Sequence, residues 1–378
     1  MSLQRMLQAL RLIRSPGIGP LVYRNLIKEH GSEEEALSFL RYKKKNIFSE
    51  KEALSEIKRH EEKSIYLLPY WDERYPKALK NMTEYPPLLS VLGKVEALHQ
   101  PMIAMVGSRN ASVHGTRLTL DIAKKLADCG YAIVSGLARG IDSAAHKGAL
   151  EQQTNPLPTI AVMAGGVDQL YPPEHGPLRD AIMNRGCLIS EMPLGMFPGA
   201  SHFPRRNRLI SGLSLAVCVM EAAKPSGSLI TANYALEQGK ELFAVPGFPL
   251  DARSKGTNDL IRNGAYVLES EEDILSVLGA PCPKLVDRIL VDKEKTQGPM
   301  KKSLNTCEKN PPEEEKICLE LKEKILENLS TVPLSTDDLL IALEGYSGDI
   351  HSALLALEFE GSIHRDARGY FSKLYTKE

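Results

Sequence analysis

The sequence predicts an α/β protein with a Rossmann-like, doubly wound and mostly parallel sheet, a small helical domain before it and a winged-helix domain after it. Three observations lead to this fold class. Strand-like apolar runs alternate with helical segments from residue 102 to 278, helical patterns fill residues 1–62, and order returns at residue 316 after a charged, proline-containing stretch. The expected domains are 1–62, 63–280 and 316–378, with a linker at 281–315.

Residues 1–62 are expected to form helices around a glycine turn. Gly17-Ile18-Gly19 separates two short helical segments, a pattern typical of helix-hairpin-helix and SAM-like domains. Such a turn can present backbone N–H groups to a nucleic-acid phosphate. A helical bundle with no nucleic-acid contact explains the pattern equally well. Two brief strands are expected within residues 65–93, with Trp71 as a packing anchor.

The central segment alternates strand-like runs with helical segments through short turns. This alternation requires right-handed crossovers and therefore a mostly parallel sheet. Residues 213–222 are apolar at nearly every position, as expected of a parallel strand covered on both faces. Ligands in such sheets bind outside the carboxyl ends of the strands. The expected strands are MIAMVGS, YAIVSG, TIAVMAGG, GCLISE, LAVCVMEA, ELFAVPG and AYVLE.

Small residues, hydroxyls and cations gather in the turns next to these strands. The turn at 226–228 lies between a buried strand and a helix, so its free N–H groups and the helix dipole favour an anion. Three arginines lie in an arginine-dense turn upstream, which favours a phosphate-bearing partner. The alternative for any one of them is an internal salt bridge to a carboxylate such as Glu191 or Glu221. The candidate binding residues are Gly107, Ser108, Arg109, Arg139, Arg205, Arg206, Arg208, Lys224, Ser226, Gly227 and Ser228.

No standard motif for a cofactor, a metal or a catalytic centre accompanies these residues. The segment 107–115 is not GxGxxG, and GxxxxGK[ST] does not occur. Asp142 and His146 share a predicted helix but supply too few ligands for a metal, and the six cysteines form no CxxC pair. The candidate serine and histidine nucleophiles lack a GxSxG elbow and an assignable base. We therefore expect no cofactor, no metal and no enzymatic activity.

The overall charge and hydropathy restrict the partners further. The net charge is −1, so a polyanion would have to bind where basic residues are concentrated locally. The first residues lack the apolar core of a signal peptide, and no later run reaches about 18 apolar residues. We expect a cytoplasmic protein without a membrane partner.

Seven ordered motifs give the chain a family resemblance. They are GSR (107–109), SGLARGIDSAAHKGAL (135–150), GGVDQLYPPEH (165–175), SEMPLG (190–195), FPRRNRLISGLS (203–214), SGSLITANYALEQGKELFAVPG (226–247) and GTNDLIRNGA (256–265). Together they resemble the DNA processing protein A family, DprA or Smf. The departures are slight and affect one loop: Ala164 stands where glycine is common, Gly165 replaces a threonine, and His175 replaces a frequent asparagine.

The resemblance implies a protein that binds single-stranded DNA without chemistry on it. It also implies contact with the RecA recombinase, which such a protein helps to load onto DNA held by single-strand-binding protein during natural transformation and recombination. A homodimer is implied as well, with the end of the Rossmann-like domain supplying both the dimer and the RecA surface. In the matching segment Leu260, Ile261 and Ile274 could form this apolar surface, or they could equally belong to the core.

A nucleotide-processing enzyme is the alternative from a different class. Rossmann-like phosphoribohydrolases use a PGGxGTxxE turn, which the segment 226–231 resembles. When Thr231 is aligned with the threonine of that pattern, Tyr234 occupies the glutamate position. The acid/base step then has no obvious agent.

The C-terminal residues 316–378 suggest three helices followed by two short strands, the winged-helix pattern. The third helix, at about 348–360, carries Asp349, Glu358 and Glu360 and neither Lys nor Arg. Because an acidic face disfavours duplex binding, we expect a protein contact or regulatory role for this domain.

Overall fold

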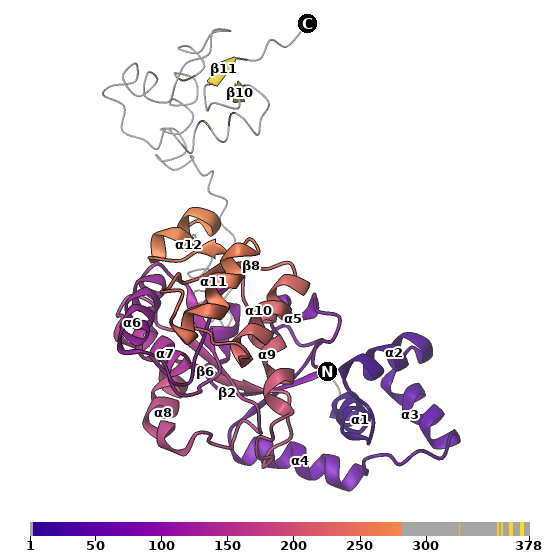
Figure 1. The fold of residues 1–378 in the computed structure, drawn as a ribbon. Coiled ribbons are helices and arrows are strands. Elements are labelled where there is room, and N and C mark those ends of the chain that lie inside the picture. The colour runs from indigo at the N-terminus through magenta and orange to yellow at the C-terminus, as the bar shows by residue number, and fades with distance from the viewer. Residues whose placement is uncertain are drawn as a thin grey trace, which may run out of the picture. The chain divides into compact units, whose positions relative to one another are not determined.

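The computed structural model describes residues 3–281 and, in the C-terminal region, Ile325, Leu354, Leu357, 363–365 and 371–373 (Figure 1). By its internal contacts the chain divides into two units, residues 1–296 and 297–378. The first unit contains the helical N-terminal region and the large α/β domain. The expected linker, apart from Pro281, and the expected C-terminal helices, apart from Ile325, Leu354 and Leu357, lie outside the described residues.

The N-terminal region is helical, as the sequence predicts. It consists of α1 (Leu3–Arg14), α2 (Pro20–His30), α3 (Glu33–Tyr42) and α4 (Glu50–Glu62). Gly17 in the turn between α1 and α2 has φ +79°, a left-handed conformation that glycine adopts at little cost. Trp71 packs against this helical core, with the Arg5 guanidinium 3.9 Å from its ring centroid, so its expected packing role is confirmed.

The α/β domain contains a nine-stranded, mostly parallel sheet in the order β1-β2-β6-β5-β4-β3-β7-β8-β9. The two brief strands β1 and β2 form its antiparallel edge, and the remaining neighbours from β6 to β9 run parallel. The seven expected strands are confirmed. The bounds are β1 (Tyr66–Pro69), β2 (Leu88–Gly93), β3 (Met102–Val106), β4 (Ala132–Ser135), β5 (Thr159–Val162), β6 (Gly186–Ser190), β7 (Ala216–Val219), β8 (Glu241–Ala244) and β9 (Tyr266–Val267).

Helices cover both faces of the sheet. Alternate residues of a strand point to opposite faces, and in the central strands both sets are apolar and are buried under helices. Ala104 and Val106 of β3 pack on the side of α5, α9 and α10. Ile103 and Met105 pack on the side of α6, α7 and α12. The bounds are α5 (Lys77–Lys80), α6 (Val113–Asp128), α7 (Ile141–Glu151), α8 (Gly176–Arg185), α9 (His202–Leu213), α10 (Gly227–Glu237), α11 (Lys255–Arg262) and α12 (Glu271–Leu278), with short 3₁₀ turns at Val95–His99, Pro173–His175 and Ala252–Ser254.

In the second unit the described residues form one antiparallel pair. Strand β10 (Ile363–Arg365) pairs with β11 (Phe371–Lys373). This pair corresponds to the two strands that the winged-helix pattern predicts. Within the described part of the chain, no helix combines the length and the apolar character needed to cross a membrane.

Candidate nucleic-acid interface

A pocket of about 460 Å³ opens at the point where the order of the parallel strands reverses. Strand β3 lies between β4, which follows it in the chain, and β7, which comes later. Ligands of open α/β sheets bind at such a switch point, beyond the carboxyl ends of the strands. The pocket is lined by Val106, Gly107, Ser108, Arg109, Asn110, Ala138, Asp142, Phe203, Arg206, Asn207, Ile210, Ala223, Pro225, Ser226, Gly227, Ser228 and Thr231.

Helix α9 forms one wall of this pocket. The expected arginine-dense turn is instead part of this helix, which runs from His202 to Leu213. Phe203, Arg206 and Ile210 line the pocket, as their three- and four-residue spacing on one helix face allows. Each residue turns the helix by about 100°. Arg205 and Arg208 therefore point away from the face that carries Arg206.

Arg206 is a buried cation at the back of the pocket. It is 5% exposed, and its Nη1 donates a 2.5 Å hydrogen bond to the Val162 carbonyl. Burial lowers the pKa of Arg206 to about 10, while the nearby Asp142 carboxylate acts in the opposite direction. A guanidinium with that pKa still carries its charge at neutral pH, so it can attract a phosphate into the pocket.

Asp142 is the carboxyl group in the pocket wall. Its Oδ2 accepts hydrogen bonds from the backbone N–H groups of Gly136 (3.1 Å) and Ala138 (3.4 Å). Burial raises the pKa of Asp142, and Arg206 counteracts this shift. The carboxylate thus holds the loop after β4 in place, with its hydrogen-bonding capacity directed at the protein.

Arg109 is the exposed cation of the pocket. Among the described residues it has no ion-pair partner, and its guanidinium carbon lies 5.0 Å from the Phe203 ring centroid. Phe203 also packs against Tyr171, with ring centroids 5.8 Å apart. The rim therefore combines a free guanidinium with an aromatic ring, the two groups that contact phosphates and bases of a single strand.

The Ser-Gly-Ser turn supplies hydrogen-bond donors opposite the arginines. Ser226 caps α10 by accepting from the Ser228 backbone N–H at 3.2 Å. The remaining N–H groups in the first turn of a helix have no intrahelical acceptor and point toward the ligand side. Gly107, Ser108, Ser226, Gly227 and Ser228 all line the pocket, as the sequence predicts.

Arg208 does not belong to this pocket, contrary to the sequence-based expectation. Its side chain is 6% exposed, and its Nη2 pairs with Glu191 Oε2 at 2.5 Å. Its Nη1 donates to the Glu84 carbonyl at 2.6 Å. Both ends of the guanidinium are thus occupied by partners inside the protein.

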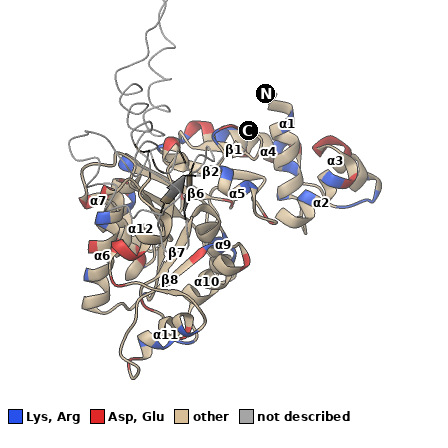
Figure 2. Cartoon of the chain, turned by 90° about the horizontal axis from the view of Figure 1, so that it is seen from above, with Lys and Arg blue, Asp and Glu red and all other residues tan. Residues whose placement is uncertain are grey.

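Three other expected cations lie outside the pocket lining. Arg139 pairs with Glu174, and Lys224 pairs with Asp259. The Arg139 and Lys224 side chains are 58% and 52% exposed, and exposed ion pairs contribute little free energy, so both can exchange their carboxylates for phosphates. Arg205 is exposed and faces a different cavity, next to the helical domain. Figure 2 shows that positive and negative residues alternate over the molecule.

Comparison with known proteins identifies the family. The family profile described as DNA recombination-mediator protein A matches residues 66–279. The chain belongs to the DNA recombination-mediator protein A (DprA) family. A second profile, the DprA-like N-terminal HHH domain, matches residues 4–58 of the helical region.

Relatives and solved structures agree with the DprA assignment. Protein Smf of Synechocystis is 35% identical over 82% of this chain and 80% of its own length. The crystal structure of DprA from Streptococcus pneumoniae superposes with a TM-score of 0.58 at 33% identity, over 71% of this chain and 92% of that one. The DprA of Helicobacter pylori, whose structure concerns its single-stranded DNA binding mode, gives 0.50 at 28% identity, over 60% and 96%.

The expected DprA dimer surface is only partly exposed in this chain. Ile274 is fully buried in the core beside α6, so it cannot contribute to a surface. Leu260 packs against the other core cluster and is half-buried, as is Ile261. The sequence could not separate core from surface here, because an apolar helix face can pack on the domain's own core or on a second chain. The exposed apolar residues at this end are Phe248, Leu250, Tyr266, Val267 and Val277.

Sequence reasoning did not single out Phe203, although its position in the FPRRNR motif was a usable signal. An aromatic residue three positions before an arginine shares a face with it once the segment is helical. Because the segment was expected to be a turn, the three-residue spacing did not indicate that Phe203 and Arg206 lie on the same face. The structure brings Phe203 next to both Arg109 and Arg206.

Proposed function

We propose that this DprA-family protein binds single-stranded DNA in the pocket at the switch point of its sheet, without chemistry on the DNA. The observation that carries this proposal is the juxtaposition of the Arg109 guanidinium, the Phe203 ring and the Arg206 guanidinium. Cations neutralise phosphates and release counterions, and an aromatic face stacks on any base. Such a site binds a strand with a strong salt dependence and little sequence preference.

The pocket supports binding of a strand more than hydrolysis of a nucleotide. Asp142, the buried carboxyl group in its wall, accepts hydrogen bonds from the backbone of the loop after β4. At the position where the phosphoribohydrolase pattern has glutamate, this chain has Tyr234. A base or acid positioned on the ligand is therefore not provided by either residue.

The biological role that follows is recombination mediation. In this proposal the protein helps to load RecA onto single-stranded DNA in the cytoplasm during natural transformation and recombination, including DNA that carries single-strand-binding protein. Support comes from membership of the DNA recombination-mediator family and from the single-stranded DNA binding named for the Helicobacter pylori relative. The domain boundaries 62/63, 280/281 and 315/316 belong to the same proposal.

The protein would act as a homodimer through the β9 end of its sheet. Strand β9 lies at the edge, and the side chains of Tyr266 and Val267 are 46% and 43% exposed. An edge strand presents unpaired N–H and C=O groups that favour pairing with another chain. Phe248 and Leu250, on the loop after β8, add exposed apolar surface. We include RecA among the partners that this end would contact.

The binding site is tested by two substitutions that remove different interactions. We expect Arg109→Ala to weaken oligothymidylate binding by about 1–3 kcal/mol and to reduce the salt slope by about one charge. We expect Phe203→Ala to weaken it by about 1–3 kcal/mol, through lost stacking, without changing the slope. Fluorescence anisotropy at several salt concentrations measures both quantities.

Arg41→Ala is the matched control, because Arg41 is an exposed arginine of the helical domain outside the pocket. Wild-type affinity and slope in both test variants would refute the site. Incubation with nucleoside monophosphates addresses the alternative function, since release of free base above background would contradict a purely binding role.

A further inference from the structure

A second cavity lies between the helical domain and the α/β domain. It has two adjoining parts of about 440 and 210 Å³, which share Ile18, Gly19, Pro20 and Arg205 in their walls. Arg205 belongs to α9, on the side of that helix away from Arg206 and the DNA pocket. The glycine turn of the helical domain and the helix that forms the DNA pocket therefore meet in one cleft.

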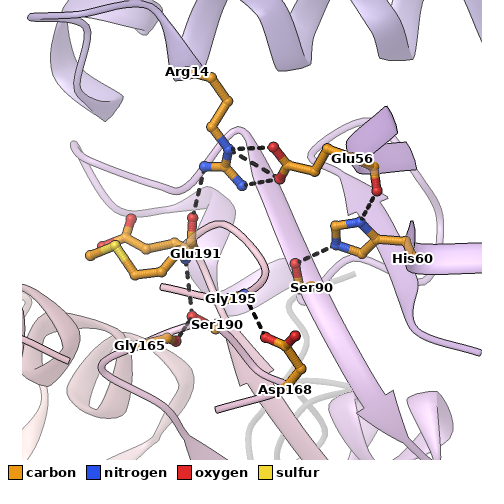
Figure 3. A network of polar contacts seen from close by, with 10 residues as sticks. Arg14, Glu56, His60, Ser90, Gly165, Asp168, Ser190, Glu191 and Gly195 are labelled. Carbon is orange, nitrogen blue, oxygen red and sulfur yellow. Dashed lines mark hydrogen bonds and ion pairs between the residues drawn. The ribbon is translucent and has the colours of Figure 1, made fainter. Parts of the chain in front are cut away.

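Buried polar contacts hold the two sides of this cleft in a fixed arrangement (Figure 3). Arg14 pairs with Glu56 at 2.8 Å, both side chains being at most 10% exposed, and its Nη1 donates to the Glu191 carbonyl at 3.2 Å. Nearby, His60 Nε2 lies 2.9 Å from Ser90 Oγ of β2. The helical domain is thus anchored beside the cleft by contacts within the protein.

The cleft contains a cation and a backbone donor that have no partner in the described part of the protein. Arg205 is exposed and forms neither an ion pair nor a hydrogen bond with a described residue. The N–H of Gly19, the N-cap residue of α2, has no acceptor among those residues either. A free guanidinium and a free backbone N–H in the walls of one cavity can both donate to a phosphate group.

The smaller part of the cavity suits a nucleobase better than a free phosphate ion. Apolar side chains are the most frequent of its lining residues, among them Pro87, Leu88 and Pro193, and they lie beside polar groups. Glu191 also lines it; its side chain is 7% exposed, and its Oε1 has no hydrogen-bond partner among the described residues. A buried acceptor without a partner costs free energy. Every nucleobase in DNA carries an N–H donor, whereas a phosphate ion near neutral pH mainly supplies acceptors.

We propose that this cleft binds a further nucleotide of the same DNA strand that occupies the pocket. Its phosphate would contact Arg205 and the Gly17–Gly19 turn, and its base would enter the smaller cavity. The continuity is provided by α9, where Arg205 and Arg206 are consecutive and face the two sites. The inference rests on the proposed single-stranded DNA binding, which it extends past α9 to the helical domain.

The test compares oligothymidylates of increasing length, from about 3 to about 12 nucleotides, because a short strand fills only the pocket. We expect Arg205→Ala in the full chain to bind the shortest strands within about twofold of wild type. It should bind the longest about tenfold more weakly, with a salt slope lower by about one. Arg41→Ala, which removes the same charge elsewhere, should match wild type at every length.

The amide contact has its own matched pair of variants. Gly19→Pro removes the N–H, whereas Gly19→Ala keeps it, and an added Cβ at this position has no atom within 4 Å. Gly19, the N-cap residue, has φ −94° in an extended conformation, about 30° from the φ that proline adopts, so the fold of Gly19→Pro is checked by urea titration. We expect weaker binding of long strands by Gly19→Pro only. If Gly19→Pro does not fold in urea titrations, Arg205→Ala decides alone.

The outcomes separate this inference from the proposed function. If Arg109→Ala weakens binding at every length while Arg205→Ala has no effect at any, the cleft does not bind the strand and the pocket does. If Arg109→Ala also binds like wild type, the proposed function itself is wrong. An Arg205→Ala defect that is equal for the shortest and longest strands would also overturn the cleft, since it would place Arg205 in the first site.

Discussion

At the scale of single residues, the charge of the proposed DNA pocket depends on a buried arginine held in one place. The Arg206 guanidinium packs directly over the backbone of Gly136 in the loop after β4, the loop that Asp142 fixes. A Cβ added to Gly136 would lie 1.9 Å from Nη1 of Arg206 and 2.3 Å from its Cζ. Position 136 therefore requires glycine because a side chain there would occupy the space of the Arg206 guanidinium, and not because of its backbone conformation.

Gly136→Ala is accordingly expected to push Arg206 out of its site and break its bond to the Val162 carbonyl. We expect a loss of about 1–3 kcal/mol in the free energy of unfolding, as for other overpacked interiors, together with weaker binding of DNA. Urea unfolding and fluorescence anisotropy measure the two effects. Gly176→Ala is the control, because the nearest atom to its added Cβ is 3.7 Å away. Unchanged stability in Gly136→Ala would show that the loop yields without cost.

The pocket residues differ in how well the sequence predicted them. Gly107, Ser108 and Arg109 follow a buried strand directly, so the parallel topology alone places them at the site. An ion pair with Glu191 was an open alternative for the arginines of this segment, but the sequence did not show that Arg208 would form it, because Glu191 lies 17 residues upstream. A partner that is distant in sequence leaves no local pattern, and an arginine that lies near other arginines in sequence need not share their surface.

At the scale of elements, α9 shows why the number of converging cations was overestimated. The segment 201–208 contains serine, proline and three arginines, a composition that suggests a turn, yet it starts a helix of 12 residues. A turn could direct all three guanidiniums to one side, whereas a helix distributes them around its axis. Arg206 thus lines the pocket, Arg205 lines the cleft, and Arg208 is buried.

Strand β9 provides the test of self-association. Its two residues are exposed on an edge that pairs on one side with β8 alone. A lysine on an edge strand discourages pairing with a second chain. Val267→Lys is therefore expected to weaken the proposed dimer at least about tenfold, measured by sedimentation velocity over a concentration series. Leu54→Lys, at an equally exposed position on α4, should leave the association unchanged. A monomeric wild type would refute the dimer.

At the scale of the whole molecule, a net charge of −1 is compatible with binding a polyanion, because arginines without a carboxylate partner in the described part of the chain line the two cavities. Arg109 and Arg205 have no carboxylate partner among the described residues, whereas Arg14 and Arg208 are held in buried ion pairs. Sequence counts could not make this distinction, since a paired and an unpaired arginine look alike in the sequence. The overall fold was predictable because alternating strands and helices allow few topologies.

The buried histidines make the stability of the whole domain depend on pH. His146 of α7 is fully buried, its Nδ1 lies 2.7 Å from Thr159 Oγ1, and its Nε2 has no partner among the described residues. Burial, with a further effect of the nearby Arg206 and His175, lowers the pKa of His146 to about 3. The unfolded chain, with an ordinary histidine pKa of about 6.5, binds this proton much more readily.

The folded protein should therefore lose stability as the pH falls below about 6.5. Between that value and about 3 the unfolded state binds one more proton at His146, so the free energy of unfolding decreases by about 1.4 kcal/mol per pH unit from this residue. Burial also lowers the pKa of His60, which acts in the same direction.

Urea unfolding at pH 7, 6, 5 and 4 measures how the free energy of unfolding changes with pH. In His146→Gln the free energy of unfolding should change less steeply with pH, by an amount that corresponds to about one proton, because glutamine does not titrate. His114→Gln is the control: this residue is exposed at the start of α6, and the variant should keep the wild-type pH dependence. Equal slopes for all three proteins would mean that His146 is protonated as easily in the folded state as in the unfolded state, and that the space around it admits water or a compensating charge.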